Sequence, residues 1–197
     1  MSFQEVCSAI AFVTCMIAFI PYGIAIVRKI ARPSKATWII WACLDTITFV
    51  GMYIKHALNG QIIGAVAGVW IIVALALKYG EPGWKLLDKF CLGGAVLGIA
   101  LWIVFNSPIV GILTSLSIVF LGSIPTFVSA WKDPSREDKL AWTIYFASCI
   151  FTMFGIQNWT LEETAQPITF LVDETVMVYI LYFHKKPVYL EISILEK

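Results

Sequence analysis

The sequence has few charged residues. Of its 197 residues, only 14% are Asp, Glu, Lys or Arg, whereas 59% are hydrophobic. A soluble domain of this size usually carries about 25% charged residues, so the composition excludes an ordinary water-facing surface. The net charge of +1 also provides no electrostatic basis for binding nucleic acid.

No cysteine pair has the spacing of a metal site. The chain has five cysteines, and none of them forms a C-x-x-C motif. All five fall in or at the edge of apolar stretches, which favours small apolar core residues over metal ligands. We therefore predict neither a metal nor a cofactor. The cysteines are Cys7, Cys15, Cys43, Cys91 and Cys149.

Long hydrophobic runs make up most of the sequence. A helix needs roughly 20 apolar residues to cross the hydrocarbon of a bilayer, and polar and helix-breaking residues divide the chain into seven such runs. The first run lacks the basic flank and A-x-A site of a cleaved signal peptide, so we expect it to remain as a helix. The predicted spans are Val6–Val27, Ala36–Lys55, Gln61–Lys78, Phe90–Phe105, Ile109–Trp131, Leu140–Gln157 and Pro167–Phe183.

The basic residues alternate between the predicted loops. If the N-terminus lies outside, every Lys and Arg except Lys55 falls on the inner side. Such a bias marks the cytoplasmic side of a membrane protein, and an even number of spans would spoil it. The sequence therefore predicts an all-α, multi-pass integral membrane protein with its N-terminus outside and its C-terminus inside. We expect it in a bacterial inner membrane.

Three pairs of identical residues recur at one spacing of 104 residues. Each half of the chain contains an apolar helix with a proline in its inner third, then a basic loop, then a helix that opens with two aromatic residues. One match could be accidental, but three matches at one offset indicate an internal repeat. The pairs are Pro21 and Pro125, Trp38 and Trp142, and Gly51 and Gly155.

The repeat divides the chain into two three-helix bundles joined by a linker helix. The first helix of each copy runs from outside to inside, so the copies are parallel and related by an axis along the membrane normal. We expect residues 1–80 to form the first bundle and residues 81–107 the linker helix with its loops. Residues 108–186 then form the second bundle, and residues 187–197 a cytoplasmic tail.

The segments Pro33–Trp41 and Ile124–Glu137 carry a resemblance to known proteins. With the 3+1+3 plan, they resemble the SWEET and PQ-loop transporter superfamily, and more closely uncharacterised bacterial membrane proteins of that shape. The resemblance implies a seven-helix fold. Tyr22 and Thr126 stand where PQ-loop proteins carry glutamine, and the second helix of each bundle lacks the proline of the SWEET tetrad. Sugar transport is therefore not implied.

Three acidic residues fall deep inside predicted spans, namely Asp45, Asp173 and Glu174. Each costs about 2.5–3.5 kcal/mol at a helix centre, whereas a large apolar residue contributes only about 0.3–0.6 kcal/mol. These acids must therefore face protein, water or each other. Glu174 is rotated by about 100° from Asp173 around the helix, so we expect these two acids to have different partners.

Helical spacing groups polar and aromatic residues with these acids. Asp45 shares a face with two tryptophans and a threonine, and the matching face of the other repeat has Cys149 in its place. Asp173 shares a face with Gln166 and Thr169. We predict a pocket between the bundles, near the membrane midplane, that binds a solute or protons. Its predicted residues are Asp45, Asp173, Glu174, Trp41, Thr48, Trp70, Tyr145, Ser148, Thr152 and Thr169.

Prolines and glycines predict where helices bend and pack closely. Pro21 and Pro125 each remove a backbone hydrogen bond and can hinge a helix, and their symmetric placement predicts a cytoplasmic gate. G-x-x-x-G motifs at 64–68 and 94–98 allow close helix contact. That contact can form within the chain or between the protomers of a homo-oligomer.

Two function classes fit these features, and a third does not. The leading hypothesis is a transporter of a small solute by alternating access, proton-coupled through the midplane carboxylates; acids beside tryptophan and tyrosine suit a cationic or zwitterionic solute. The alternative is a receptor or scaffold for a peptide or protein partner. We expect no enzyme and assign no catalytic residue, because Asp173 lacks the Gly-x-Gly-Asp context of aspartyl intramembrane proteases.

Overall fold

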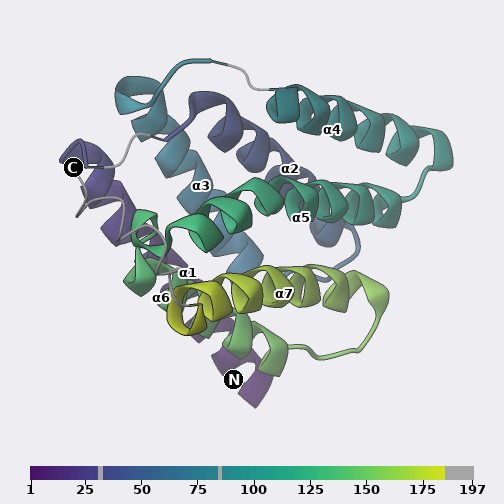
Figure 1. Cartoon of the computed structure of the whole chain (residues 1–197). Helices are drawn as coiled ribbons and strands as arrows, with labels where there is room; N and C mark the ends of the chain where they lie inside the picture. Colours follow the sequence, from purple (N-terminus) through teal and green to yellow (C-terminus); the bar gives the residue numbers. More distant parts are fainter. Residues whose placement is uncertain (31–32, 84–85, 185–197) are drawn as a thin grey trace, which may run out of the picture.

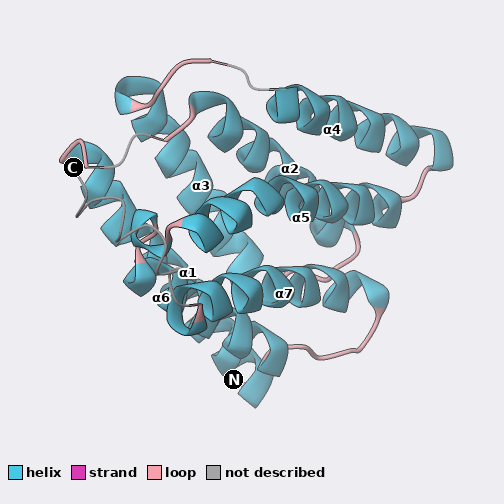
Figure 2. Cartoon of the chain, viewed as in Figure 1, coloured by secondary structure: helices cyan, strands magenta, loops and turns pink. Residues whose placement is uncertain are grey.

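Helix follows helix along the chain (Figures 1 and 2). The computed structural model describes residues 1–30, 33–83 and 86–184, except for the side chains of Leu87, Pro125 and Arg136, and these residues contain no β-strand. The predicted all-α class is therefore confirmed. The elements are α1 (Phe3–Val27), α2 (Lys35–Ile54), α3 (Gly60–Tyr79), α4 (Leu86–Phe105), α5 (Pro108–Lys132), the 3-10 helix η1 (Pro134–Arg136), α6 (Lys139–Phe154) and α7 (Leu161–Phe183).

The helices match the predicted spans closely. Each predicted span falls on one helix, and the largest difference is at the start of α7, which begins at Leu161 rather than Pro167. Among the described residues, α1 to α5 are long and apolar enough to cross a membrane. α6 is a shorter apolar helix of 16 residues, and α7 has 23 residues and contains four acids. The lengths and composition thus indicate a membrane protein.

Side chains at two equivalent positions start the second helix of each half. Ser34 Oγ accepts a hydrogen bond from the backbone N–H of Thr37 at 3.3 Å, and Asp138 Oδ1 accepts one from that of Ala141 at 2.9 Å. Such N-caps pair an amide that the helix itself leaves free. Ser34 and Asp138 are 104 residues apart, as are Thr37 and Ala141, so both halves begin this helix in the same way.

The helices form two triplets with the same internal order. α3 packs between α1 and α2, and α7 packs between α5 and α6. The triplets meet where α1 contacts α6 and where α2 contacts α5, while α4 lies outside against α5 and α2 (Figure 1). If α1, α2 and α3 are matched with α5, α6 and α7 in that order, the contact of α1 with α6 corresponds to the contact of α5 with α2. The two triplets therefore contact each other through equivalent helices.

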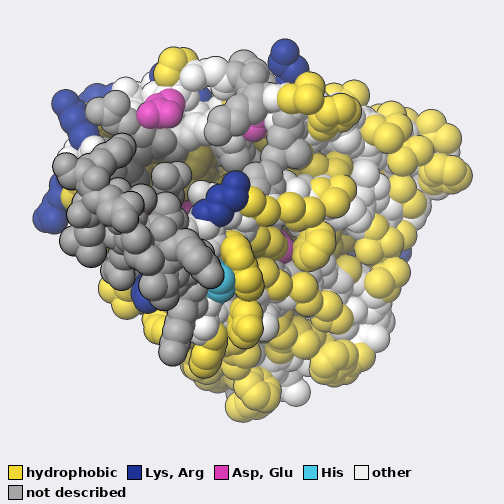
Figure 3. Space-filling model, viewed as in Figure 1, with side chains coloured by type: hydrophobic (Ala, Val, Ile, Leu, Met, Phe, Trp, Pro, Cys, Tyr) yellow, Lys and Arg dark blue, Asp and Glu magenta, His cyan; other side chains and the backbone are white. Residues whose placement is uncertain are grey.

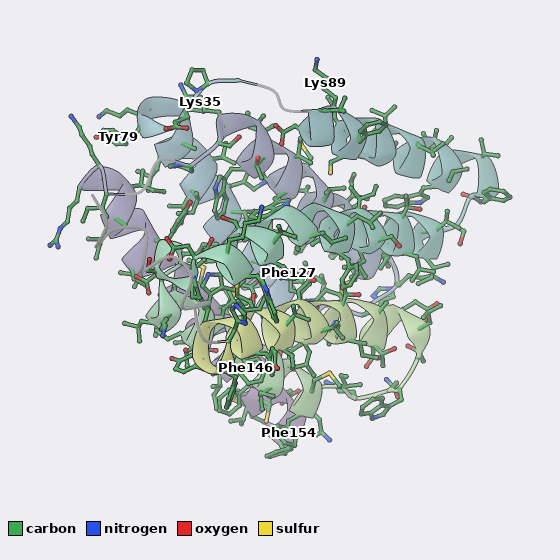
Figure 4. All side chains as sticks on the ribbon, in the orientation of Figure 1. Lys35, Tyr79, Lys89, Phe127, Phe146 and Phe154 are labelled. Carbon is green, nitrogen blue, oxygen red and sulfur yellow. The ribbon has the colours of Figure 1, made fainter. Side chains whose placement is uncertain are left out.

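Alternate helix ends define the two ends of the bundle. We call the end where α2, α4 and α6 begin the basic end, because the predicted basic loops lie there, and the opposite end the N-terminal end. Two of these loops are joined at the basic end: Lys35 N donates to Glu81 O at 3.2 Å, and Glu81 N donates to Pro33 O at 2.9 Å. In Figure 4, Lys35, Tyr79 and Lys89 lie along this edge. The predicted tail, residues 187–197, lies outside the described residues.

Glycines allow the helices to approach each other closely. A Cβ on Gly64 would lie 3.1 Å from the Cβ of Cys15 on α1, and one on Gly68 would overlap the ring of Phe19. On α4, a Cβ on Gly98 would lie 3.2 Å from Thr114 Cβ of α5. The predicted close contact is confirmed, and both G-x-x-x-G motifs pack within the chain.

The cysteines behave as small core residues. All five are free thiols, and Cys7, Cys15 and Cys149 are buried, while Cys43 and Cys91 are partly buried. Cys15 and Cys149 belong to one apolar cluster between the triplets. The prediction that the cysteines are small residues of the packed interior therefore holds for the three buried ones.

Large apolar side chains cover the outside of the bundle. Ile103 and Val104 of α4 are 73% and 75% exposed, and Ile71 of α3 is 51% exposed. Figure 3 shows apolar side chains spread over the side formed by α4, α5 and α7, whereas most Lys and Arg lie toward the other side. An apolar surface this large is unfavourable in water, so it indicates contact with lipid.

Both helices predicted to contain a hinge are continuous. α1 runs through Pro21, and α5 runs through position 125, each over 25 residues. The side chain of Pro125 lies outside the described part of the chain. Proline removes a backbone donor and weakens the helix at that point, so a hinge at these positions stays a prediction.

Candidate functional site

A cavity of about 390 Å³ lies between the two triplets and is lined by the first turns of α2 and α6 at the basic end. Its walls come from α1, α2 and α3 on one side and from α5, α6 and α7 on the other. Phe127, labelled in Figure 4 between α5 and α7, contributes to the wall. We call this space the central cavity. Its volume is within the range typical of small-molecule sites.

The lining of the central cavity repeats at the spacing found in the sequence. Eight pairs of lining residues are 104 positions apart, with one member from each half of the chain. Equivalent positions of the two halves therefore face one space. The pairs are Phe19 and Ser123, Tyr22 and Thr126, Pro33 and Glu137, Ser34 and Asp138, Thr37 and Ala141, Trp38 and Trp142, Trp41 and Tyr145, and Val69 and Asp173.

All three predicted membrane acids line the central cavity. Asp45 comes from α2, and Asp173 and Glu174 come from α7. Their exposed fractions are 6%, 7% and 6%. Asp45 lies about 15 Å along α2 from its first residue, which is half the roughly 30 Å thickness of a hydrocarbon core. The cavity thus extends from the basic end to the middle of the helices.

The carboxyl groups of α7 have few protein partners. Ser123 Oγ donates to Asp173 Oδ2 at 3.5 Å. Asp173 Oδ1 and Glu174 Oε2 are buried and have no hydrogen-bond partner among the described residues. No ion pair in the described part of the chain includes Asp45 or either of these acids. A buried carboxylate without a partner is costly, so the site favours a proton or a cationic group beside these oxygens.

Aromatic rings form a continuous wall between the mouth of the cavity and Asp45. Tyr22 stacks on Trp38 with 5.3 Å between ring centroids, and Trp38 meets Trp41 edge to face at 5.4 Å. In the other half, the indole N–H of Trp142 donates to Glu137 Oε2 at 3.0 Å. A solute in the cavity would therefore contact ring faces as well as carboxyl groups.

The acid at the mouth has an altered proton affinity. Glu137 lies in the loop between η1 and α6, and partial burial raises its pKa, while the hydrogen bond from Trp142 opposes that rise. Burial disfavours the charged form of an acid, whereas a donor to the carboxylate favours it. Relative to its charged form, the uncharged form of Glu137 is thus favoured more in the folded protein than in an unfolded chain.

A hydrogen-bond network closes the bundle on the N-terminal side of the central cavity. Asn59 Nδ2 donates to Gln166 Oε1 at 2.8 Å, Gln166 Nε2 donates to Gln61 Oε1 at 3.0 Å, and Gln61 Nε2 donates to Cys149 Sγ at 3.0 Å. These side chains belong to both triplets. Gln166 precedes Asp173 by about 10 Å along α7, so the network lies between the acids and the N-terminal end.

Two further contacts join the triplets near this network. Ser148 Oγ on α6 donates to the carbonyl of Ala11 on α1 at 2.8 Å. Lys55 Nζ lies 3.3 Å from Glu162 Oε1 and forms an ion pair between the end of α2 and the start of α7. The N-terminal half of the bundle is thus held by polar contacts as well as by apolar packing.

A second cavity, of about 590 Å³, lies at the N-terminal end. It is lined by residues that include Glu5, His56, Asn59 and Glu163. The two cavities have no lining residue in common. Asn59 of the hydrogen-bond network lines this second cavity, whereas Gln61 and Gln166 line neither cavity.

Comparison with known proteins gives no further information. The chain matches no protein-family model, no curated protein and no solved structure. The resemblance to SWEET and PQ-loop proteins stays a sequence-based prediction. The function must therefore be argued from the residues and their geometry.

The structure brings half of the ten predicted solute- or proton-binding residues together. The acids were predicted because of their cost in lipid, and the aromatic residues because of their helical spacing. Three acids and two of the predicted aromatic residues face the space between the triplets. The predicted residues that line the central cavity are Asp45, Asp173, Glu174, Trp41 and Tyr145.

Trp70 differs from its predicted position. It is 45% exposed on the outside of α3, and its indole N–H donates to Thr46 Oγ1 at 3.1 Å. The neighbouring residue Val69 lines the cavity instead. Trp70 is equivalent in sequence to Glu174, but α3 presents only one of the two adjacent positions to the cavity, and the next position points about 100° away.

Four predicted hydroxyl residues also lie outside the central cavity. Ser148 lies in the contact between α1 and α6, and Thr152 donates to the Ser148 carbonyl at 2.8 Å and lines the cavity at the N-terminal end. Thr169 donates to Ala165 O at 2.8 Å, and Thr48 is fully buried in α2 with Oγ1 unpaired among the described residues. The hydroxyls of Thr152 and Thr169 thus bond to the preceding turn of their own helix, as is common in helices.

The sequence analysis missed Gln61 and Glu137. Gln61 lies in the first turn of α3, where a polar residue usually meets water, yet it is fully buried. A usable signal was present, because Gln61 and Gln166 are 105 residues apart, one more than the repeat spacing. Glu137 lies at the repeat position of Pro33, and no residue pattern marked it before the two halves were seen together.

Proposed function

We propose that this protein moves a small solute across a membrane by alternating access between two parallel three-helix bundles. The observation that carries the proposal is the lining of the central cavity, where equivalent positions of the two halves surround Asp45, Asp173 and Glu174. The matching contact order of the two triplets supports a parallel repeat. Solute sites near the midplane at a repeat interface are typical of secondary transporters.

In this proposal all seven helices cross the membrane. α6 has 16 residues and covers about 24 Å, which suits a slightly thinned bilayer. α7 turns Asp173 and Glu174 toward the cavity rather than toward lipid. The basic end faces the cytoplasm by the charge rule, in a bacterial inner membrane. The central cavity then faces the cytoplasm, and the glutamine network closes the outer side.

Alternating access requires a second conformation that opens the outer side. That opening separates α3 from α6 and α7, and so breaks the hydrogen bonds of Gln61 and Gln166. Each such bond contributes a net of about 0.5–1.5 kcal/mol. Losing a few of them raises the free energy by a few kcal/mol, within the range in which minor conformations are populated. Hinges at Pro21 and Pro125 would close the cytoplasmic side.

The proposal keeps the resemblance to SWEET and PQ-loop proteins that the sequence predicts. A 3+1+3 order, with α4 at the periphery and the two bundles facing each other, is what a member of the SWEET and PQ-loop superfamily would have. The three acids supply groups that can exchange a proton with the solute, because water or a cation reaching them stabilises the charged form. Proton coupling is therefore part of the proposal.

Transport in reconstituted liposomes tests this function. The full chain, purified and reconstituted, is expected to take up at least one solute from a panel of amino acids, vitamins, nucleosides, sugars and amines. Asp173→Asn keeps the size of the side chain but cannot ionise, so we expect it to lower uptake by about tenfold or more. Glu81→Gln changes an exposed loop acid outside the cavity and serves as the matched control.

Two results would count against the proposal. If folded Asp173→Asn has the same uptake and the same pH dependence as the parent protein, the acid does not couple transport to protons. If no solute enters the liposomes, and a protein partner is recovered with the chain from native membranes, the receptor or scaffold alternative is favoured. Thermal unfolding of each variant in the same detergent shows whether it is folded.

A further inference from the structure

We propose that the transported solute is a small organic ammonium ion with an apolar or aromatic body. This proposal rests on the proposed transport function and names the class of its substrate. It is carried by the charge of the central cavity, by unpaired carboxyl oxygens in its wall and by the aromatic surface beside them.

The first observation is the sign of the charge. Five acidic residues line the central cavity, and no Lys, Arg or His of the described chain lines it. A cavity lined by one sign of charge raises the local concentration of the opposite sign. A solute that carries a carboxylate or phosphate would meet no cationic partner among the described residues of this wall. The acids are Asp45, Glu137, Asp138, Asp173 and Glu174.

The second observation is that two acceptors in the wall lack a donor. Asp173 Oδ1 and Glu174 Oε2 are buried without a hydrogen-bond partner among the described residues, and both side chains are more than nine-tenths buried and line the cavity. An ammonium group carries up to three N–H donors and a positive charge. An ammonium group beside these two carboxyl groups would offset the cost of burying their charge.

The third observation is that two side-chain donors near the mouth, on Thr37 and Trp142, are already engaged, and that an acid caps the start of α6. Asp138 caps the start of α6, Thr37 Oγ1 donates to Asp88 Oδ1 at 3.0 Å, and the indole N–H of Trp142 donates to Glu137. The helix starts at the mouth therefore present a carboxylate and occupied donors rather than free N–H groups. This arrangement disfavours anions and the carboxylate of a zwitterion.

The aromatic wall selects an organic cation rather than a bare metal ion. Tyr22, Trp38 and Trp41 form contiguous ring contacts beside Asp45, and ring faces attract ammonium groups and pack against apolar bodies. Calcium needs six to eight oxygen ligands. In the described residues, no three His, Cys, Asp or Glu side chains are grouped closely enough to hold a metal ion.

A series of four probes of similar shape tests the substrate class. Phenethylamine carries an ammonium group, 2-phenylethanol is neutral, phenylalanine is zwitterionic and 3-phenylpropionate is anionic. Binding to the purified full chain is measured by calorimetry at neutral pH. We expect phenethylamine to bind at least about 30-fold more tightly than 2-phenylethanol, and the zwitterion and the anion to bind no better than the alcohol. Equal binding of the amine and the alcohol, or tighter binding of phenylalanine, would overturn the proposal.

Neutral variants locate the bound probe. Asp45→Asn and Glu174→Gln preserve side-chain size, and each should weaken phenethylamine binding by about tenfold or more, with little effect on 2-phenylethanol. Glu81→Gln, outside the cavity, should leave both affinities within about twofold. Thermal unfolding without ligand shows that each variant is folded. If folded variants of both cavity acids bind the amine as the parent does, the ammonium site is not this cavity and the proposal fails.

Uptake of labelled phenethylamine into liposomes separates this inference from the transport function. Binding that depends on Asp45 and Glu174, without uptake, would support the ammonium site and overturn transport. Uptake of a different solute, together with no binding of phenethylamine, would support transport and overturn the ammonium class.

Discussion

Gln166 on α7 donates its side-chain amide to the side-chain carbonyl of Gln61 on α3 at 3.0 Å, and both residues are fully buried. Their positions differ by 105, one more than the spacing of the repeat. Gln61 and Gln166 thus occupy nearly equivalent positions of the 104-residue spacing and meet between the two triplets. The closure at the N-terminal end depends on this contact, because Gln166 also bonds Asn59 and Gln61 also bonds Cys149.

Gln166→Leu is expected to weaken that closure. The change removes the partner of the buried amide of Gln61 and of the partly buried amide of Asn59, and an unsatisfied buried polar group costs about 1–3 kcal/mol. In the proposed transport cycle, the conformation open at the N-terminal end should become more populated, so a membrane-impermeant thiol reagent added on that side should label Cys15 or Cys149 faster than in the parent protein. Mass spectrometry of the labelled chain measures the rate at each thiol.

Gln157→Leu provides the matched control for this change. Gln157 lies beside the second cavity, and its side chain takes no part in the network of Gln61 and Gln166. Labelling of Cys15 and Cys149 should therefore stay at the rate of the parent protein. Equal labelling in Gln166→Leu and Gln157→Leu would show that the network does not hold the outer side closed.

Gly68→Val should destabilise the first triplet. A Cβ at position 68 would overlap the Phe19 ring of α1, and overpacking of this kind typically costs about 1–3 kcal/mol. Gly93→Ala on α4 is the control, because no atom lies within 4 Å of a Cβ there, and alanine favours a helix by about 1 kcal/mol over glycine. Thermal unfolding in one detergent should show a lower Tm for the first variant only; equal Tm values would contradict the packing.

Glu137→Gln should change how stability depends on pH. Partial burial raises the pKa of Glu137 above its ordinary value of 4.5, so its contribution to stability is present below that pH and is lost as the pH rises through the folded-state pKa. The glutamine does not titrate and can still accept from Trp142. The Tm of the variant minus that of the parent should therefore increase between about pH 4 and pH 7. A difference that stays constant over this range would refute the raised pKa of Glu137.

Trp41→Leu tests the aromatic wall against an aromatic residue outside it. Cation–π contacts in a desolvated site contribute about 2 kcal/mol, so this change should weaken phenethylamine binding by up to about 30-fold. Trp70→Leu should have no such effect, because Trp70 lies on the outside of α3 and donates to Thr46. Similar losses in both variants would mean that the amine does not bind against the cavity wall.

The sequence predicted the positions and order of the helices far better than the direction in which single side chains point. The length of an apolar run and the polar or helix-breaking residues that end it depend on local chemistry, so the predicted spans fell on α1 to α7. The largest difference is at the start of α7, which begins six residues before Pro167. The acids were found because lipid makes an ionisable group costly wherever it lies. The 104-residue spacing identified Trp38 and Trp142, which both line the cavity.

Whether a single side chain points into the cavity depends on how its helix is rotated about the helix axis. Sequence spacing alone does not determine that rotation. The repeat aligned Trp70 with Glu174, but only α7 turns both adjacent positions toward the cavity. Ser148 belongs to the predicted polar face, yet the contact of α6 with α1 takes its hydroxyl. Gln61 was missed because its partner lies in the other half of the chain. These details come from tertiary packing between segments about 100 residues apart.

Asp45 and Cys149 are 104 residues apart, at equivalent positions of the two halves, but their side chains have different roles. At one and the same repeat position, the first half presents a carboxyl to the central cavity, and the second half places a thiol on Gln61 of the closure. A homodimer of a single half could not do this, because both subunits would carry the same residue there. In the proposed two-repeat fold, joining both copies in one polypeptide permits an asymmetric site, whose negative charge comes from α2 on one side and from α7 on the other.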